Sequence, residues 1–371
     1  MKQIVYYQTE GLNDVKKILK DQKIKKILLF SDSPAFNLTG AKDFFSKLES
    51  DYIIYNVNNF SPNPKFVELN KILNNIQKID FDIIVAIGGG SVIDMAKLVK
   101  IFSAQDFPAD RYFEESINFV NPTKKMIAIP TTFGTGSEAT HFAVLYKKKV
   151  KHSIADDKIL PEYVILDPSL TKSIPDYVAA CSAMDAFSQA IESFWSVNAN
   201  EESRRYSSKA ITILKDNMIS AVKEKDIKSK RNVQYAAYLA GKAINISKTT
   251  APHAFSYSLT SHFNIPHGQA VGIFLPVIFK FNYENHENSK GAWNSLKKEL
   301  LLLLEVTNVD EAVKLIYDIM SSIGLKTKIK DLDLPLLEVQ DKVRNGVNIP
   351  RLSNNPVYIG NWDILNIIKE I

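Results

Sequence analysis

Three of the chain's six histidines fall within residues 249–268, and the outer two, His253 and His267, are fourteen residues apart. A proline precedes each of these two. Imidazole binds transition metals, and it also gives and takes protons near neutral pH. His253 and His267 could therefore be metal ligands, catalytic groups or polar residues of packed helices. The histidine between them, His262, is interpreted as structural.

A carboxylate and an amide are placed to act together in the segment 184–195, MDAFSQAIESFW. Its apolar residues recur at helical spacing, so Asp185 and Gln189 are expected one turn apart on one face of a helix.

A glycine-rich loop follows an apolar strand in AIGGGSVIDMAK, residues 86–97. Gly88, Gly89 and Gly90 would let backbone approach a ligand closely, and the first N–H groups of the following helix would face an anion. Ser91 is expected to cap that helix, with Asp94 as its capping-box partner. The spacing fits neither the three-glycine Rossmann fingerprint nor a Walker loop. A tight strand–helix turn without a ligand is the alternative.

A second loop, IPTTFGTGSEAT at 129–140, also follows a strand and offers hydroxyls from Thr131, Thr132, Thr135 and Ser137. Loops at the carboxyl ends of parallel strands converge where open α/β sheets bind ligands, which favours a nucleotide cofactor. Asp32 follows a third strand. It could bind a ribose 2′-OH and would repel a 2′-phosphate, which favours NADH over NADPH, or it could be a simple turn aspartate.

The elements that must position these residues change type along the chain. Strand-like runs alternate with helical ones in the first half, which predicts a parallel sheet covered by helices. The predicted strands are 23–32, 51–57, 81–87, 124–130 and 162–168. After residue 168 nearly every segment has helical periodicity. We therefore predict an α/β dinucleotide-binding domain over 1–170 and an all-α domain over 171–371.

Composition narrows the class of protein. The 371 residues are 45% hydrophobic and 23% charged, and the net charge is +5. The basic residues are spread along the chain, so no nucleic-acid partner is expected, whereas a small anionic substrate fits this balance. The single cysteine, Cys181, excludes an intramolecular disulfide and is expected to be a buried thiol. Without a signal-like N-terminus or a membrane-length apolar run, a cytoplasmic protein is expected.

Five motifs in order resemble those of the iron-containing alcohol dehydrogenase family. They are Gly88–Ser91, Pro130–Glu138, Asp185 with Gln189, His253, and His267 within Pro-His-Gly. The resemblance covers essentially the whole chain. It implies a Rossmann-like nucleotide-binding domain and a helical metal-binding domain, the fold shared with dehydroquinate synthase. It also implies a homodimer and hydride transfer between a nicotinamide and an alcohol or aldehyde.

The resemblance further implies that Asp185, Gln189, His253 and His267 bind a divalent metal, Fe(II) or Zn(II). The family usually has a histidine where Gln189 stands, and an amide oxygen is a weaker and harder ligand than imidazole. The other three ligands suffice for a catalytic site with open positions. A metal-free hydrogen-bonded network of these groups is the alternative.

The resemblance also indicates residues close to the reacting groups. Many family members have a histidine at position 257. Tyr257 is one helical turn after His253, so its hydroxyl could relay a proton together with His267, or its ring could serve only for packing. Lys151 matches a family lysine near the cofactor.

Two segments, WSVNANEESR (195–204) and ISKTTAPHA (246–254), resemble the phosphonoacetaldehyde reductase subgroup, which makes 2-hydroxyethylphosphonate. Thr249 or Thr250 could cap the helix that carries His253, with Pro252 in its first turn. A helix N-terminus beside Lys248 would suit a phosphonate dianion. The expected substrate residues are Lys248, Thr249, Thr250, Asn198, Asn200 and Arg204. A solvated Lys248 and turn-forming asparagines are the alternatives.

The sequence therefore predicts NADH-dependent, metal-assisted reduction of phosphonoacetaldehyde. A dehydrogenase for an uncharged small alcohol or polyol would use the same motifs. A lyase or cyclase related to dehydroquinate synthase is disfavoured by the Pro130–Glu138 loop. A non-catalytic nucleotide-binding protein would follow if Gln189 meant that the metal is lost.

Overall fold

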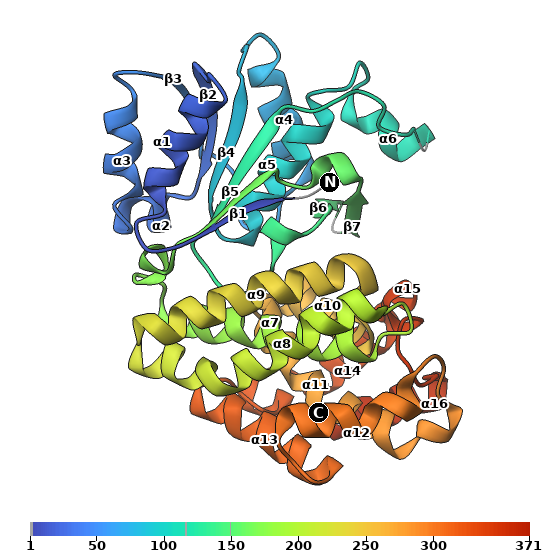
Figure 1. The fold of residues 1–371 in the computed structure, drawn as a ribbon. Coiled ribbons are helices and arrows are strands. Elements are labelled where there is room, and N and C mark those ends of the chain that lie inside the picture. Colours follow the sequence, from blue (N-terminus) through green and yellow to red (C-terminus); the bar gives the residue numbers. More distant parts are fainter. Residues whose placement is uncertain (1–2, 116, 149) are drawn as a thin grey trace. The chain divides into compact units, whose positions relative to one another are not determined.

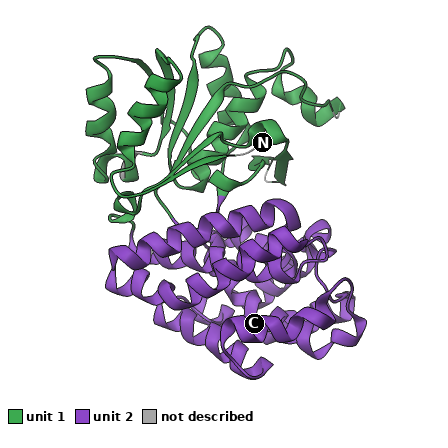
Figure 2. Cartoon of the chain, in the orientation of Figure 1, with its two compact units in different colours: residues 1–132, 137–174 green, residues 133–136, 175–371 purple. Residues whose placement is uncertain are grey.

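The computed structural model describes residues 3–115, 117–148 and 150–371. The chain forms two compact units (Figure 2). Unit 1 comprises residues 1–132 and 137–174, and unit 2 comprises 133–136 and 175–371. The sequence predicted a boundary between residues 170 and 171, and it did not predict that the short piece 133–136 of the second loop would be part of the helical unit.

Unit 1 is built on a six-stranded parallel sheet in the order β1-β8-β5-β4-β2-β3 (Figure 1). The strands are β1 (Ile4–Tyr7), β2 (Lys26–Ser31), β3 (Ile53–Val57), β4 (Ile83–Gly88), β5 (Lys125–Pro130) and β8 (Tyr163–Leu166). The helices are α1 (Leu12–Asp21), α2 (Ser33–Leu38), α3 (Ala41–Leu48), α4 (Phe66–Ile76), α5 (Gly90–Phe102) and α6 (Ala109–Glu115). Helices connect the central strands, as parallel pairing requires.

Helices cover the sheet on both faces because its central strands are apolar on both sides. In β2, Leu28 and Phe30 belong to the core that contains α4 and α5. The alternating residues Ile27 and Leu29 belong to the core that contains α1 and α3. Successive side chains of a strand point to opposite faces, so a continuous apolar run is the pattern of a strand buried between two helical layers.

Two strand features of unit 1 were not identified from sequence. Strand β1 has only four residues, all of them exposed or half-buried, and it lies at the edge of the sheet. Strands β6 (Phe142–Lys147) and β7 (Val150–Ala155) form a separate antiparallel pair. Short, partly exposed strands carry a weak apolar signal, which is why the sequence pattern did not reveal them.

Unit 2 is helical, and no strand follows β8 in the part of the chain that the structure describes. Its helices are α7 (Asp176–Trp195), α8 (Glu201–Ile219), α9 (Ile227–Ser247), α10 (Ala251–Phe263), α11 (His267–Glu284), α12 (Trp293–Leu304), α13 (Val309–Ser322), α14 (Leu336–Gly346), α15 (Ile349–Leu352) and α16 (Asn361–Glu370). Together with the parallel sheet of unit 1, this confirms the predicted fold class.

Helix α7 is the centre of unit 2. It is buried without a break from Ala183 to Trp195, and α8, α9 and α11 all pack against it. A helix surrounded on all sides is apolar or small at most positions, so each charged residue on it must have a partner. Asp185 and Glu192 are such residues.

None of the helices in the described ranges combines the length and the apolar run that crossing a membrane requires.

Candidate active site

The predicted cofactor loops meet at one edge of the sheet of unit 1. Register pairs Ser31 with Ile87 and Gly88 with Pro130, so β2, β4 and β5 end side by side. The backbone N–H of Thr131 donates to Gly88 O at 3.0 Å. The structure therefore brings Asp32, the GGGS loop and the start of the second loop to the same carboxyl edge.

Gly88 and Gly89 differ in whether the fold itself requires a glycine at that position. Gly88 has φ +158°, and a Cβ there would lie 2.5 Å from Val92 Cγ2, so the turn itself excludes a side chain. A Cβ at Gly89 would make only ordinary contacts, 3.5 Å from Thr132 Cγ2 and 3.8 Å from its hydroxyl oxygen. The fold therefore requires glycine at position 88. It does not require glycine at position 89, where the lack of a side chain would instead allow close approach of a ligand.

The predicted capping box at Ser91 is wrong. Helix α5 begins at Gly90 with Gly89 as its N-cap residue, and it has no side-chain cap. The Ser91 hydroxyl instead accepts from the backbone N–H of Asn63 at 3.1 Å. Asp94 accepts from Ser137 instead of from the N-cap backbone. With Ser91 as the N-cap residue the helix was expected to begin at residue 92, and it begins two residues earlier, at Gly90. The Ser91 side chain therefore does not accept from the first N–H groups of α5.

One carboxylate oxygen of Asp32, Oδ1, is buried without a hydrogen-bond donor among the described residues. Burial raises the pKa of this carboxyl, although backbone N–H groups of Ala35, Phe36 and Gly89 oppose the rise. A buried acceptor at the cofactor edge suits a sugar hydroxyl.

Ser137 is buried in unit 1 and bonds within it, and its expected contact with the cofactor stays a prediction. Its side chain is 5% exposed, and its hydroxyl donates to Asp94. Lys97 Nζ donates to Ser137 O at 2.7 Å, to Thr140 Oγ1 at 3.0 Å and to Phe142 O at 2.6 Å. Burial lowers the pKa of Lys97 to about 8. These bonds tie α5, which begins in the GGGS loop, to the second loop.

Lys151 lies on β7, and its charge lowers the pKa of Asp94, whose net pKa is nevertheless raised by burial. Lys151 belongs to the same unit as the GGGS loop.

The middle of the second loop packs on the helices of unit 2. A Cβ at Gly134 would lie 2.7 Å from Ser182 Cα on α7. Gly136 has φ +61°, and a Cβ there would lie 2.6 Å from Gly241 Cα on α9. Thr135 lies between these two glycines, and its carbonyl accepts from Gln189 Nε2 at 3.3 Å. The loop motif thus reaches the helix of the predicted metal ligands.

Asp185, His253 and His267 come together in unit 2, with one ligand atom of each within 4.8 Å of the others. His253 Nε2 lies 3.3 Å from Asp185 Oδ1. The rings of the two histidines are 5.1 Å apart at 78°. Asp185 and His253 are buried, and His267 is half-buried. A carboxylate and two imidazoles converging at this separation match the donor set of a catalytic transition-metal site.

The helices explain why residues so distant in sequence converge. Asp185 is in the middle of α7, His253 in the first turn of α10, and His267 is the first residue of α11. A Cβ at Gly268 would lie 1.8 Å from Cys181 O. Only glycine lets the start of α11 approach α7 this closely, so the Pro-His-Gly motif brings His267 to Asp185.

Gln189 tests whether this group suits a cation. Its Nε2 donates to Thr135 O at 3.3 Å. Oε1 is buried and has no hydrogen-bond donor among the described residues. An orphaned oxygen one turn from Asp185 fits a cation ligand. Asp185, Gln189, His253 and His267 are therefore suitable residues to hold a divalent metal.

Acidic and imidazole side chains shift one another's pKa values in this group. Burial acts to raise the pKa of Asp185, but the hydrogen bond and charge of His253 and the charge of His267 outweigh it, so the pKa is lowered. Burial acts to lower the pKa of His253, but Glu192 and Asp185 on either side of the ring raise it to about 10. Two carboxylates flank one imidazole, which attracts either a proton or a metal cation.

Glu192 belongs to the site and was missed by the sequence analysis. Its side chain is completely buried, and its Oε1 lies 2.5 Å from His253 Nδ1. The signal was present, because Glu192 is seven residues after Asp185 and three after Gln189, on the same face of one helix. This spacing could have identified Glu192 as a neighbour of the predicted metal ligands.

Tyr257 lies beside the metal-ligand group. Its ring stacks on that of His267, with centroids 5.9 Å apart and planes at 23°. The residue is half-buried. This placement is compatible with either proton relay or packing.

Three of the expected substrate residues, Asn198, Asn200 and Arg204, bond to other residues of unit 2. Asn200 caps α8 in a capping box with Ser203, and Asn198 Nδ2 donates to Asn354 Oδ1 at 2.8 Å. Arg204 Nη2 donates to Ala199 O at 3.1 Å, and its buried Nε has no acceptor among the described residues. Asn200 therefore has the local turn role that the alternative interpretation expected, whereas the Asn198 side chain bonds to a distant part of the chain.

The predicted side-chain cap of α10 is wrong. Thr250 is the N-cap residue, but it makes no side-chain cap bond. Its hydroxyl is fully buried, donates to Glu192 Oε2 at 3.0 Å and accepts from Trp195 Nε1 at 2.8 Å. Thr250 is thus unavailable to an anion. Thr249 is 6% exposed, and its carbonyl accepts from Asn354 Nδ2 at 2.9 Å.

Lys248 has a backbone conformation that is nearly confined to glycine. It lies directly after α9 with φ +62° and ψ 172°, and it is half-buried. Its Nζ donates to Asn245 O at 3.3 Å. A conformation of this kind costs about 1–3 kcal/mol and persists only where the surroundings enforce it. Lys248 precedes His253 by five residues.

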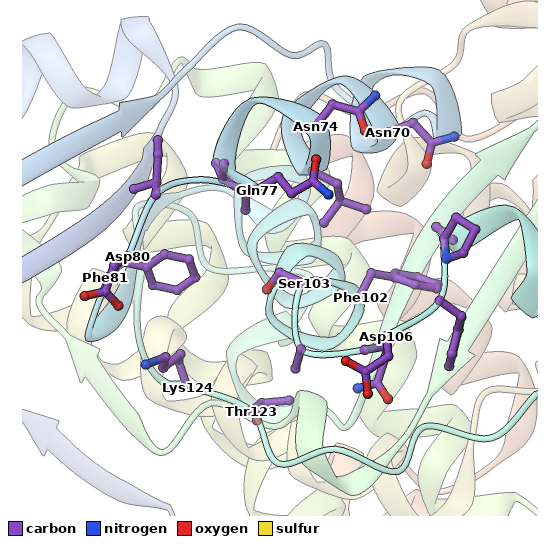
Figure 3. A pocket seen from close by; sticks show the side chains of 18 of the residues that line it. Asn70, Asn74, Gln77, Asp80, Phe81, Phe102, Ser103, Asp106, Thr123 and Lys124 are labelled. Carbon is purple, nitrogen blue, oxygen red and sulfur yellow. The ribbon is translucent and has the colours of Figure 1, made fainter.

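A hollow of about 990 Å³ lies elsewhere in unit 1 (Figure 3). Its lining comes from the ends of α4 and α5 and from the segments before β4 and β5, so it lies at the amino edge of the sheet, opposite the cofactor loops. Several of its polar side chains already have protein partners, as in Asn70 with Asp110 and Asp80 with Lys26. We assign no ligand to it.

Comparison with known proteins covers both units. Residues 3–168 match the family model described as iron-containing alcohol dehydrogenase. Residues 179–371 match that of the Fe-containing alcohol dehydrogenase family, C-terminal. Alcohol dehydrogenase 4 of Saccharomyces cerevisiae is 25% identical over 378 residues, which cover 99% of this chain and 96% of the yeast protein.

Two further relatives act on small carbonyl or hydroxyl compounds according to their names. The 4-hydroxybutyrate dehydrogenase of Clostridium kluyveri is 31% identical over 260 residues, 69% of this chain and 67% of that protein. The crystal structure of sulfoacetaldehyde reductase from Bifidobacterium kashiwanohense in complex with NAD+ has a TM-score of 0.88 and 27% identity, and the match covers 99% of this chain and 96% of that one. With both units matched, the chain belongs to the iron-containing alcohol dehydrogenase family and is an alcohol dehydrogenase-type oxidoreductase.

Proposed function

We propose that this enzyme reduces phosphonoacetaldehyde with NADH to give 2-hydroxyethylphosphonate and NAD+. The reaction places a hydride on the carbonyl carbon and a proton on its oxygen. The observation that carries the proposal is the group of Asp185, His253 and His267 in unit 2, preceded in the chain by the constrained Lys248.

The cofactor side rests on the carboxyl edge of unit 1. Packing does not require glycine at position 89, so its lack of a side chain favours close approach of a pyrophosphate to the start of α5. The buried Oδ1 of Asp32 suits the ribose 2′-OH. A 2′-phosphate beside this carboxylate would be repelled, which favours NADH over NADPH. The sulfoacetaldehyde reductase with a similar fold was crystallised with NAD+.

The metal side rests on four residues of unit 2. Asp185, Gln189, His253 and His267 would hold a divalent cation. When bound, the cation supplies Lewis acidity to the carbonyl and the nicotinamide supplies the hydride. Three of these side chains come from the central helix α7 and the first turn of α10, and rigid helices keep ligand geometry precise.

Proton delivery is assigned to Tyr257. Its ring stacks against that of His267, one of the residues that would hold the metal, so a phenol that can donate a proton belongs to the surroundings of this group.

Recognition of the phosphonate is assigned to Lys248. Its side chain is the cation nearest in sequence to the metal-ligand helix α10, and its backbone is held in a costly conformation. Strain of this kind is commonly kept where a side chain must point in a particular direction. The sulfoacetaldehyde reductase is named for another two-carbon aldehyde with an anionic group, which supports this substrate class.

A general reductase of small aldehydes is the second candidate. The observation that favours it is that Thr250, Asn198 and Asn200 bond within the protein and cannot all complete an anion pocket.

Comparing aldehydes tests the two candidates. Initial rates of NADH oxidation at neutral pH would be measured with phosphonoacetaldehyde, sulfoacetaldehyde and butyraldehyde at equal concentration. A preference of a hundredfold or more for phosphonoacetaldehyde, about 2.7 kcal/mol, is expected if the phosphonate is recognised. Equal rates on all three would establish the general reductase, and preference for sulfoacetaldehyde would move the assignment to a sulfonate.

Lys248→Ala sharpens this test. The variant is expected to raise KM for phosphonoacetaldehyde about tenfold or more and leave that for butyraldehyde within twofold, since a hydrogen bond to a charged group contributes about 1.5–3 kcal/mol. Lys248→Arg keeps the charge and is the matched control. Equal effects of Lys248→Ala on the two aldehydes would remove Lys248 from the site.

A further inference from the structure

Glu192 is a completely buried carboxylate with three donors around it. Its Oε1 lies 2.5 Å from His253 Nδ1. Its Oε2 accepts from Thr250 N at 2.6 Å and from Thr250 Oγ1 at 3.0 Å. A buried charge is tolerated only when hydrogen bonds compensate its lost hydration. Both oxygens are thus engaged, one by the metal-ligand residue and one by the turn that precedes its helix.

We propose that Glu192 is the positioning residue of this site, holding His253 for the metal and the turn 247–250 for the substrate. The substrate half of this proposal rests on the proposed function, and the metal half does not.

The bond to Nδ1 determines how His253 can act. A carboxylate only accepts hydrogen bonds, so Nδ1 must carry the hydrogen. Nε2 is then the atom left to act as a ligand, and it is the atom that faces Asp185 Oδ1 at 3.3 Å. A carboxylate behind a ligating imidazole fixes its tautomer and ring orientation and raises its basicity, and loss of such a partner typically weakens metal binding by about 10–100-fold.

The bonds to Thr250 hold one end of the turn 247–250. The other end is held by the same helix, because Ser247 Oγ donates to Ser193 Oγ at 2.7 Å and Ser196 Oγ donates to Ser247 O at 2.8 Å. The constrained Lys248 lies between these anchors. The last two turns of α7 therefore enforce the backbone conformation of Lys248, and the same helix carries Asp185 and Gln189.

Glu192→Gln is the main test, since it keeps the side-chain size and replaces one oxygen by a donor. An amide oxygen can still accept from His253 or from Thr250, but its NH2 group opposes the other donor. Zn²⁺ affinity would be measured by competition with a chromogenic chelator, and the visible spectrum of the Co²⁺ form would report ligand geometry. We expect Zn²⁺ binding weakened by 10–100-fold and an altered Co²⁺ spectrum.

Two controls separate positioning from general damage. Glu162→Gln alters another mostly buried carboxylate, which pairs with Lys100 at 2.8 Å in unit 1, and it should leave Zn²⁺ affinity unchanged. NADH binding, followed by its fluorescence, should be the same in Glu192→Gln and in the unmodified enzyme. A folded Glu192→Gln enzyme that binds Zn²⁺ as tightly as the unmodified enzyme would overturn the proposal.

Glu192→Asp and Thr250→Val keep the proposal testable if Glu192→Gln does not fold. Glu192→Asp shortens the side chain by one methylene and should also weaken Zn²⁺ binding. Thr250→Val removes only the hydroxyl, so Zn²⁺ affinity should stay within threefold while KM for phosphonoacetaldehyde rises at least fivefold more than KM for butyraldehyde. Unchanged Zn²⁺ affinity in Glu192→Asp would contradict the metal half. Equal KM changes in Thr250→Val would contradict the turn half.

The metal half can be tested independently of the proposed function, whereas the substrate half depends on it. If the unmodified enzyme reduces no phosphonoacetaldehyde, the proposed substrate is wrong, and the Zn²⁺ and Co²⁺ measurements still decide the role of Glu192.

Discussion

At the scale of single residues, the unusual feature is Gln189. It stands where the family usually has histidine, one helical turn after Asp185, and none of the residues that the structure describes donates to its Oε1. We expect Gln189→His to tighten Zn²⁺ binding by about tenfold, or 1.4 kcal/mol, since imidazole is the better ligand for this cation. Chelator competition measures the change, and Gln77→His on exposed surface of unit 1 is the control. Unchanged affinity would mean that position 189 does not face the metal.

A second residue-scale prediction concerns Glu138, which is buried near Lys97 and Asp94. Burial raises the pKa of Glu138 from an ordinary value of 4.5 to about 7, although the charge of Lys97 acts to lower it. Between pH 4.5 and 7 the folded protein therefore holds more protons than the unfolded chain, so this carboxyl's contribution to stability falls as pH rises through that window. Its full cost, roughly 3 kcal/mol at most, is present above pH 7.

Glu138→Gln removes that charge and keeps the size. We expect the variant to be more stable than the unmodified enzyme at pH 8, by roughly 2–3 kcal/mol, and to differ by less than about 1 kcal/mol at pH 5. Urea denaturation at both pH values measures the difference, and Glu49→Gln on exposed surface should show none. A gain that does not depend on pH would show that the charge is not the cause.

At the scale of elements, the close approach of α11 to α7 brings His267 to Asp185. Gly268→Ala would place Cβ 1.8 Å from Cys181 O, a backbone atom that cannot swing away. We expect α11 to shift, with a stability loss of about 3 kcal/mol or more and Zn²⁺ affinity reduced at least tenfold. Urea denaturation and chelator competition measure the two effects.

Gly272 provides the matched control in the same helix. A Cβ there would lie 3.0 Å from Met184 Cγ and 3.2 Å from Met320 Cε, and both methionine side chains are flexible. Gly272→Ala should therefore cost less than about 1.5 kcal/mol and leave Zn²⁺ affinity unchanged. If the two alanine variants behave alike, the contact at Cys181 does not position His267.

The GGGS loop permits a test of the remaining choice between a cofactor loop and a simple turn. A Cβ at Gly89 meets no atom closer than 3.5 Å. Gly89→Ala should thus fold with stability within about 1 kcal/mol of the unmodified enzyme, yet bind NADH at least tenfold more weakly, because the methyl occupies the approach of the pyrophosphate. Fluorescence titration measures the affinity. Normal NADH binding would support the simple turn.

Elements also show what sequence could and could not predict. The apolar runs of β2, β4 and β5 predicted a sheet buried on both faces, because strand burial is local information. The order of the six strands, and the four-residue β1 at its edge, depend on pairings between distant segments. Ser91 and Thr250 were expected as caps because serine and threonine favour that position, but Asn63 and Glu192 compete for their hydroxyls. Glu192 itself was readable from helical spacing and was overlooked.

At the scale of the whole molecule, the residues expected to bind the cofactor and those expected to bind the metal belong to different units. The glycine loop and Asp32 belong to unit 1, whereas Asp185, Gln189, His253 and His267 belong to unit 2. A ligand that binds only the folded state stabilises it by an amount set by its concentration relative to Kd, about 2.7 kcal/mol at one hundred times Kd. Because no metal-ligand residue lies in unit 1, the stabilisation by Zn²⁺ and that by NADH should be lost through different substitutions.

His267→Ala and Gly89→Ala separate the two effects in thermal denaturation of the full chain. His267→Ala should lose the upward shift of several degrees that saturating Zn²⁺ gives and retain the shift that NADH gives. Gly89→Ala should do the reverse. If instead His267→Ala also lost the NADH shift, the metal group would be required to build the cofactor site, and the assignment of one ligand group to each unit would be wrong.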